Sequence, residues 1–170
     1  MRAASALAES RRRVVGVADL AVSDRAGELL VTYALGSCLG IAVYDPVACV
    51  GGLLHVMLPL STLDARKAAA NPAMFVDTGV PRLFTECYRA GAVKERLIVK
   101  VAGGARLQGR EGDDTFRIGE RNVLMLRKLL WKNGVLVEAQ DVGGEHWRTM
   151  SLQMGTGTVT VRTEAGEVEL

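Results

Sequence analysis

The stretch that decides the fold covers residues 39–57 and reads LGIAVYDPVACVGGLLHVM. Residues 39–44 and 50–57 are short apolar segments with several β-branched side chains, which is typical of strands. Asp45-Pro46 between them is a turn signal. The connection is too short for the crossover that parallel strands need, so the sequence predicts an antiparallel hairpin here.

The predicted register of this hairpin places a cysteine beside a histidine. A loop over residues 45–48 sets Cys38 directly across from His55. Opposed residues on one face of an antiparallel pair have Cβ atoms about 4.5–5.5 Å apart. We therefore expect the thiol and the imidazole to lie within hydrogen-bonding reach. A thiol activated by an adjacent imidazole is the minimum apparatus of cysteine acyl transfer.

Outward from the hairpin, strands and helices are mixed. Apolar residues near Val80–Tyr88 have helical spacing, with Pro81 expected in the first turn and Gly91 at the C-terminal cap. A second helix is expected over residues 120–132. Further strands are expected at residues 29–33, 97–101, 135–137, 149–153 and 158–162. The pattern predicts a mixed α/β sandwich with much antiparallel pairing.

Composition excludes several classes of protein. The 170 residues are 49% hydrophobic and 24% charged, which fits one globular domain with a real core. A net charge of +2 is too small to indicate a nucleic-acid or anionic-membrane partner. Three cysteines without a C-x-x-C pair fit neither a disulfide framework nor a zinc knuckle. The scattered thiols indicate a reducing, cytoplasmic location.

The N-terminal residues differ in composition from the rest. Residues 1–13 are rich in Ala, Ser and Arg and end in the basic run Arg11–Arg13. A secretory signal has its basic residues first, so the order here argues against one. We expect residues 1–13 to be a flexible basic tail and residues 14–170 to form a single domain.

Structural explanations compete with the catalytic one. A lone cysteine in an apolar segment is usually a small buried hydrophobe, which is our interpretation of Cys49 and Cys87. A lone histidine in a strand is more often a packed core residue than a catalyst. One cysteine and one histidine also lack two of the ligands that a metal site requires. Taken alone, Cys38 and His55 leave these alternatives open.

Several motifs together resemble a known family. Residues 32–38 read TYALGSC, and residues 51–59 read GGLLHVMLP. With Asp45-Pro46 between them, these segments resemble the CheD family of chemoreceptor glutamine deamidases. The similarity extends from Val14 to about Arg162 and continues through DT at 77–78, KVAGGA at 100–105, IGERN at 118–122 and DVGG at 141–144.

The resemblance implies a fold, an activity and partners. The implied fold is an α+β, three-layer α/β/β sandwich, similar to the catalytic domains of deamidating bacterial toxins. The implied activity is conversion of selected glutamines of methyl-accepting chemotaxis receptors to glutamate, without metal or organic cofactor. Such an enzyme would be cytoplasmic and would visit membrane-bound receptor arrays. A CheC-type phosphatase is implied as a second partner, and neither nucleic acid nor membrane insertion is expected.

The resemblance also assigns roles to residues. Cys38 matches the nucleophile, His55 the base and Thr32 the residue that orients the histidine. We expect the bend at Gly36 and Ser37 to support the oxyanion through backbone N–H groups. Residues 145–148 (EHWR) depart from the family pattern, which bears on receptor preference or on a partner surface. The alternative function is a non-catalytic binding module that docks chemoreceptors or the phosphatase.

Overall fold

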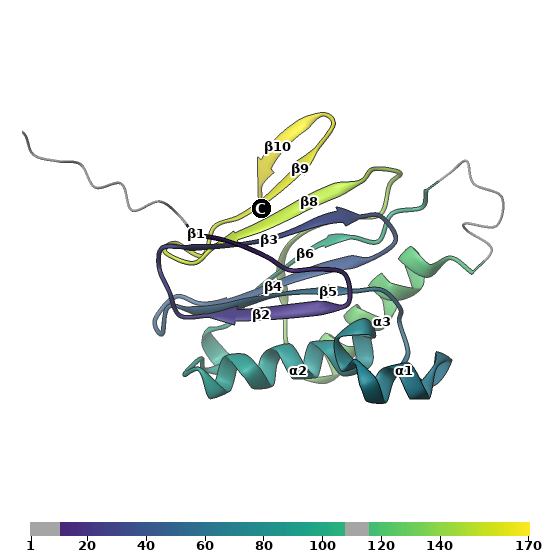
Figure 1. Cartoon of the computed structure of the whole chain (residues 1–170), viewed down its shortest axis with the longest axis horizontal. Coiled ribbons are helices and arrows are strands. Elements are labelled where there is room, and N and C mark those ends of the chain that lie inside the picture. Colours follow the sequence, from purple (N-terminus) through teal and green to yellow (C-terminus); the bar gives the residue numbers. More distant parts are fainter. Residues whose placement is uncertain (1–10, 108–115) are drawn as a thin grey trace, which may run out of the picture.

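Three stacked layers make up the protein (Figure 1). The computed structural model describes residues 11–107 and 116–170. Two five-stranded sheets lie face to face, and helices cover the outer side of one of them. Within the described residues, six of the eight strand pairings are antiparallel. The α+β class and the mostly antiparallel sandwich predicted from the sequence are confirmed.

The sheet in the middle of the sandwich carries the hairpin. Its spatial order is β2 (Asp19–Ser23), β5 (Val50–Val56), β4 (Leu39–Asp45), β6 (Ile98–Gly103) and β7 (Val137–Val142). Every residue of β4 and β5 is buried, because one face of these strands meets the other sheet and the opposite face meets the helices.

The outer sheet contacts the middle sheet through one face only. Its spatial order is β1 (Arg11–Val14), β3 (Glu28–Leu35), β8 (Arg148–Gln153), β9 (Val159–Thr163) and β10 (Gly166–Glu169). Buried residues alternate with less buried ones along β8, as expected for a sheet with one face on the core.

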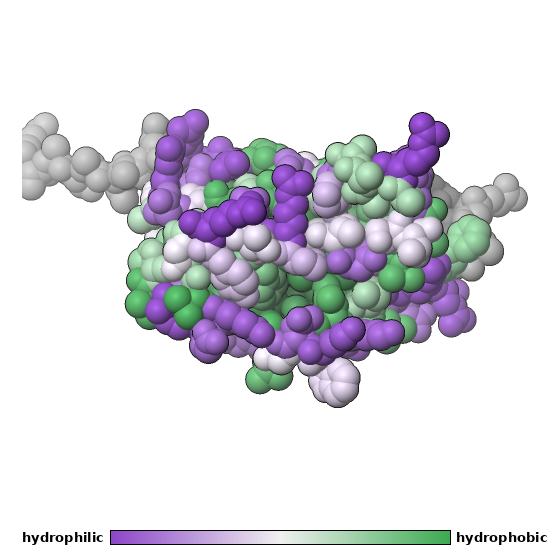
Figure 2. Space-filling view, turned by 90° about the horizontal axis from the view of Figure 1, so that it is seen from below, coloured by the Kyte–Doolittle hydropathy of each residue, from purple (hydrophilic) through white to green (hydrophobic). Residues whose placement is uncertain are grey.

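The helices form the third layer beneath the middle sheet. They are α1 (Ala65–Ala70), α2 (Val76–Arg89) and α3 (Ile118–Lys132). The short 3-10 helix η1 (Ser61–Leu63) precedes α1, η2 (Pro72–Met74) joins α1 to α2, and η3 (Lys94–Arg96) follows α2. Buried residues of α2 recur at helical spacing, so one stripe of the helix packs on the sheet. Hydrophilic side chains project over much of the outer side of this layer, with apolar ones between them (Figure 2).

Two apolar clusters hold the layers together. One lies between the helices and the middle sheet and includes Ile41, Leu54 and Leu83. The other lies between the two sheets and includes Ala42 and Leu53, with residues of β3, β8 and β9. Odd-numbered residues of β5 therefore face the other sheet, because side chains alternate along a strand. His55 shares this parity and points between the sheets.

The β4–β5 hairpin differs in register from the prediction. Gly40, and not Cys38, lies opposite His55. The whole register is displaced by two residues. Because side chains alternate with a period of two, an even displacement leaves each side chain on its predicted face.

Asp45 explains the displacement. It is the last residue of β4, and its carboxylate accepts the N–H groups of Val47 and Ala48 at 2.9 and 3.0 Å. The loop then ends with Cys49 in the left-handed conformation at φ 54, and Val50 pairs with Asp45. The loop thus covers residues 46–49, one position later than predicted.

The predicted tail is too long at its inner end. Arg11, Arg12 and Arg13 belong to β1, which runs parallel to β3 and pairs Arg11 with Glu28. These residues are held by main-chain hydrogen bonds, one of which joins the Arg11 N–H to the Gly27 carbonyl oxygen at 2.8 Å. The rest of the predicted tail, residues 1–10, lies outside the described residues.

Two further boundaries are corrected. Helix α2 begins at Val76, so Pro81 lies inside it and not in its first turn. The helix starts early because the N–H of Val76 donates to the Leu58 carbonyl oxygen at 2.9 Å. The strand predicted at residues 135–137 begins at Val137, because the N–H of Val135 still donates to the Leu130 carbonyl oxygen at the end of α3.

Candidate active site

Thr32 and His55 meet in the gap between the two sheets. Thr32 lies on β3 and His55 on β5, both are fully buried, and Oγ1 of Thr32 is 2.7 Å from Nδ1 of His55. The same hydroxyl donates to the carbonyl oxygen of Val15 at 2.7 Å. A hydroxyl has one hydrogen, so towards the imidazole Thr32 can only accept. Nδ1 of His55 therefore carries the ring hydrogen, and Nε2 carries a lone pair.

The Nε2 atom of His55 is poised as a base. It is buried and has no hydrogen-bond partner in the described part of the chain. Burial lowers the pKa of His55 to about 4, because desolvation disfavours the imidazolium. The ring is therefore neutral near pH 7, with an uncommitted lone pair that can take a proton.

Cys38 lies on the same side of the middle sheet as His55. It sits in the bend between β3 and β4, is partly buried, and packs against the cluster between the sheets. Counted from Gly40, it is a diagonal neighbour of His55, and such neighbours lie about 7–8 Å apart in a regular ladder. Among the residues described, the sulfur forms no hydrogen bond to Nε2, so the predicted direct contact is wrong.

The thiol and the imidazole are both uncharged at rest. Burial raises the pKa of the Cys38 thiol, while its own backbone N–H, which faces the sulfur, lowers it in part. With the pKa of His55 lowered, both shifts favour the neutral thiol and the neutral imidazole over a thiolate–imidazolium pair.

The other two cysteines lie outside this arrangement. Cys87 is fully buried on α2, and burial raises its pKa to about 12, so the prediction of a buried hydrophobe is confirmed there. Cys49 is exposed, and the same prediction is wrong for it. Its place at the end of the hairpin loop turns it outward.

The end of β6 fixes the bend that carries Cys38. The carbonyl oxygens of Gly36 and Cys38 accept the N–H groups of Ala105 and Gly104, each at 2.8 Å. The N–H groups of Ser37 and Cys38 donate to no main-chain carbonyl in residues 11–107 and 116–170. Within these ranges, the two amides beside the Cys38 thiol are thus without a main-chain acceptor.

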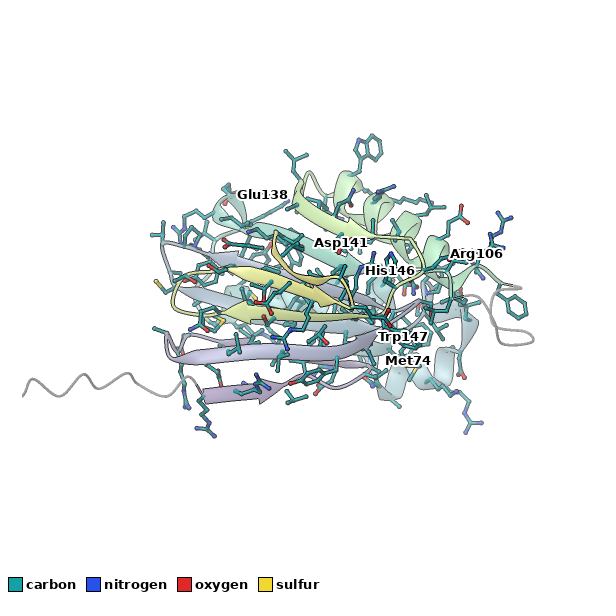
Figure 3. All side chains as sticks on the ribbon, turned by 90° about the horizontal axis from the view of Figure 1, so that it is seen from above. Met74, Arg106, Glu138, Asp141, His146 and Trp147 are labelled. Atoms are coloured by element: carbon teal, nitrogen blue, oxygen red, sulfur yellow. The ribbon has the colours of Figure 1, made fainter. Side chains whose placement is uncertain are left out.

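An aromatic ring borders the bend. A Cβ atom added to Gly36 would lie 3.0 Å from the ring of Trp147, which is 55% exposed. The loop before β8 is held by Arg148, whose guanidinium pairs with Asp141 at 3.0 Å. Figure 3 shows Trp147 and its neighbour His146 towards the right-hand end of the molecule. Trp147, in the segment of residues 145–148, therefore lies beside the bend that carries Cys38.

Asn122, to which the sequence assigns no role, contacts the segment that carries Cys38 and the segment that carries His55. Asn122 of α3 is fully buried, and its side-chain Nδ2 donates to the carbonyl oxygens of Ser37 and Met57, both at 3.0 Å. It belongs to the IGERN motif at residues 118–122. That motif marked the resemblance, but a sequence motif does not reveal which side chain faces the site.

Comparison with known proteins identifies the family. A family model described as "CheD chemotactic sensory transduction" matches residues 57–163. The chain is 52% identical over 155 residues to "Probable chemoreceptor glutamine deamidase CheD 1" of Syntrophus aciditrophicus, which covers 90% of this chain and 94% of the relative. The chain belongs to the CheD family.

Other CheD relatives are similar over nearly the same span. "Probable chemoreceptor glutamine deamidase CheD" of Solibacter usitatus is 45% identical over 157 residues, covering 92% of each chain. The protein of that name from Pyrococcus abyssi is 42% identical over 157 residues, covering 92% of this chain and 94% of its own length. The family-model match begins just after His55, so the three candidate catalytic residues precede it.

The helices of this CheD-family chain carry no membrane-span signal. Within the described ranges, none of them is both long and apolar enough to cross a bilayer.

Proposed function

We propose that this CheD-family chain is a chemoreceptor glutamine deamidase with Cys38 as nucleophile, His55 as general base and Thr32 as the residue that fixes the histidine. The names of these relatives, probable chemoreceptor glutamine deamidases, support this activity and substrate. The observation that carries the mechanism is the Thr32 hydroxyl between Val15 and His55, because it assigns the hydrogen to Nδ1 and leaves Nε2 free.

The first step forms the covalent intermediate. Nε2 of His55 takes the Cys38 proton as the sulfur attacks the carboxamide carbon of a substrate glutamine. Since the thiol and the imidazole start uncharged, charge develops only as the carbon–sulfur bond forms. The Ser37 and Cys38 N–H groups are placed to stabilise the oxyanion of the tetrahedral intermediate.

The second step releases ammonia. The protonated His55 returns its proton to the nitrogen, because an amide nitrogen leaves poorly without one. The carbon–nitrogen bond breaks, and a thioester joins Cys38 to the substrate side chain. Water, deprotonated by the again-neutral His55, then hydrolyses the thioester to glutamate and regenerates the thiol.

Thr32 makes this cycle repeatable. Its hydrogen is committed to the Val15 carbonyl oxygen, so its oxygen always faces Nδ1 as an acceptor. That contact prevents the ring from adopting the tautomer with hydrogen on Nε2, which could not act as a base towards Cys38. The third member of a triad has this orienting role.

Ammonia release from a purified receptor cytoplasmic fragment tests the proposal. We expect ammonia in step with a mass increase of the fragment equal to replacing NH2 by OH, located at glutamine residues. Cys38→Ala should abolish both signals, and Cys49→Ser is the matched control that should retain them. A fragment that binds but yields no ammonia would instead identify the docking module. The CheC-type phosphatase is a second proposed partner, testable by co-purification.

A further inference from the structure

We infer that Asn122 is a positioning residue that sets the separation between Cys38 and His55. The inference rests on the proposed function, since it assigns Asn122 a part in the same reaction. Asn122 lies on α3, a different element from either catalytic residue, and is fully buried. Its Nδ2 group reaches both catalytic segments at once.

Asn122 makes its two hydrogen bonds just beyond the last paired residues of β4 and β5. The β4–β5 pairing ends with Leu39 opposite Val56. Beyond that pair, the N–H groups of Met57 and Leu58 donate to the Met74 carbonyl oxygen at 2.8 and 3.1 Å, so the segment after β5 turns away towards η2. It diverges there from the segment before β4, immediately beside Cys38.

Asn122 bridges the diverging chains. Its Nδ2 donates at 3.0 Å to the Ser37 carbonyl oxygen, one residue before Cys38, and at 3.0 Å to the Met57 carbonyl oxygen, two residues after His55. Both amide hydrogens are used in this way. A single rigid group thereby ties the nucleophile bend to the end of the strand that carries the base.

The hydrogen bonds of the Asn122 side chain run through its NH2 group. Among the described residues, its Oδ1 is buried and has no hydrogen-bond partner. The polar contacts seen for this side chain are therefore those to the segments that carry Cys38 and His55.

Helix α3 is packed closely enough to deliver this side chain. A Cβ atom added to Gly119 would lie 2.5 Å from the Ala105 carbonyl oxygen and 2.7 Å from that of Gly104. Only a glycine allows the helix to approach this turn so closely. The N–H of Gly104 in turn holds the Cys38 carbonyl oxygen, so helix, turn and nucleophile form one connected unit.

Three variants test the inference. Asn122→Leu removes both donors at similar volume. Asn122→Asp offers a donor only while its carboxyl is protonated, and when ionised it faces two carbonyl oxygens. Asn133→Asp is the matched control, because Asn133 lies at the exposed end of the same helix and its Nδ2, within the described residues, bonds the Leu129 carbonyl oxygen and neither catalytic segment.

Steady-state deamidation kinetics give the first readout. For Asn122→Leu we expect kcat to fall at least tenfold with KM changed less than twofold, since the substrate surface is untouched. For Asn122→Asp we expect activity to decrease as pH rises and its carboxyl ionises, a limb that the wild type and Asn133→Asp lack. Wild-type kcat per folded molecule in Asn122→Leu, or a wild-type pH profile in Asn122→Asp, would overturn the inference.

The rate of Cys38 alkylation by iodoacetamide separates this inference from the proposed function. In a Cys49→Ser background we expect Asn122→Leu to slow Cys38 labelling as much as His55→Ala does, while Asn133→Asp leaves it unchanged. This readout needs no receptor, so it decides the positioning role even if no ammonia is released by the wild type. Labelling of Cys38 at the wild-type rate in both Asn122 variants would contradict the inference. If Asn122→Leu does not fold, Asn122→Asp above the pKa of its carboxyl provides the same comparison, because the donor is then lost.

Discussion

His55 lies directly opposite Gly40 in the β4–β5 ladder, and Cys38 lies two residues before Gly40 on the same side of the sheet. Because that partner is a glycine, it places no side chain beside the imidazole. The proposed nucleophile is a diagonal neighbour of the proposed base, and Nε2 has no protein partner within the described residues. This geometry leads to four predictions.

A side chain at Gly40 would collide with buried residues. A Cβ atom there would lie 2.7 Å from Sδ of Met150 and 2.9 Å from Cδ1 of Leu35, both fully buried. We expect Gly40→Ala to lower the free energy of unfolding by about 1–3 kcal/mol through overpacking. Gly16→Ala is the control, since nothing lies within 4 Å of a Cβ atom there. Equal urea midpoints for the two variants would show that the core yields more than the structure indicates.

Thr32→Val should impair catalysis while keeping the side-chain volume. Without the hydroxyl, the Nδ1 hydrogen of His55 has no acceptor and the tautomer is no longer fixed. Partners that orient metal-bound histidines contribute roughly ten- to a hundredfold, and we expect a loss of kcat of the same order here. Thr32→Ser keeps the hydroxyl and should retain most of the activity. Full kcat in Thr32→Val would show that the tautomer needs no threonine.

The pH dependence of stability should reveal the buried imidazole. The pKa of His55 is lowered to about 4 from its usual 6.5. Between these pH values the unfolded chain binds a proton that the folded chain does not. The free energy of unfolding should therefore fall as pH is lowered through this window, by at most about 1.4 kcal/mol per pH unit.

His55→Gln provides the comparison for that measurement, because it lacks the titrating group. Its urea-unfolding free energy should vary less between pH 6.5 and 4 than that of the wild type. Asp45, whose pKa is held well below the usual range by its bonds to Arg96, is present in both proteins, so its contribution cancels in the comparison. Parallel pH curves for wild type and variant would contradict the assignment of a neutral buried His55.

Thiol labelling should separate the three cysteines. Cys49 is exposed and should react with iodoacetamide as an ordinary thiol, whereas the buried Cys87 should react only on unfolding. Cys38 should react at a rate that depends on His55, and His55→Ala should slow it. A Cys38 rate that is insensitive to His55 would mean that the imidazole does not take its proton.

The hairpin shows how far sequence reasoning reached. The strands of residues 39–44 and 50–57 and their antiparallel pairing follow from apolar, β-branched segments around a turn, and the structure confirms them. The register does not follow, because the side chain of Asp45 organises the loop and moves it by one position. Cys38 and His55 still lie on the same face of the sheet, because the register is displaced by an even number of residues.

Other features depend on contacts that no local pattern contains. Strand β2 and the segment of Arg11–Val14 gain their structure by pairing with β5 and β3, and neither has a strong pattern of its own. The contact between Thr32 and Val15, and that between Asn122 and the two catalytic segments, join residues that are distant in the chain. Such partners become visible only when the sheets and helix α3 are assembled.

Trapping of the acyl-enzyme is the sharpest test of Cys38 as the nucleophile. The wild-type protein is mixed with a receptor peptide that contains a substrate glutamine, quenched in acid during turnover, digested and analysed by mass spectrometry. The proposed mechanism predicts that the Cys38 peptide gains the mass of the receptor peptide less one ammonia. Cys38→Ala and His55→Ala should show no such adduct. Ammonia release that persists in Cys38→Ala, or an adduct on Cys49 in place of Cys38, would contradict it.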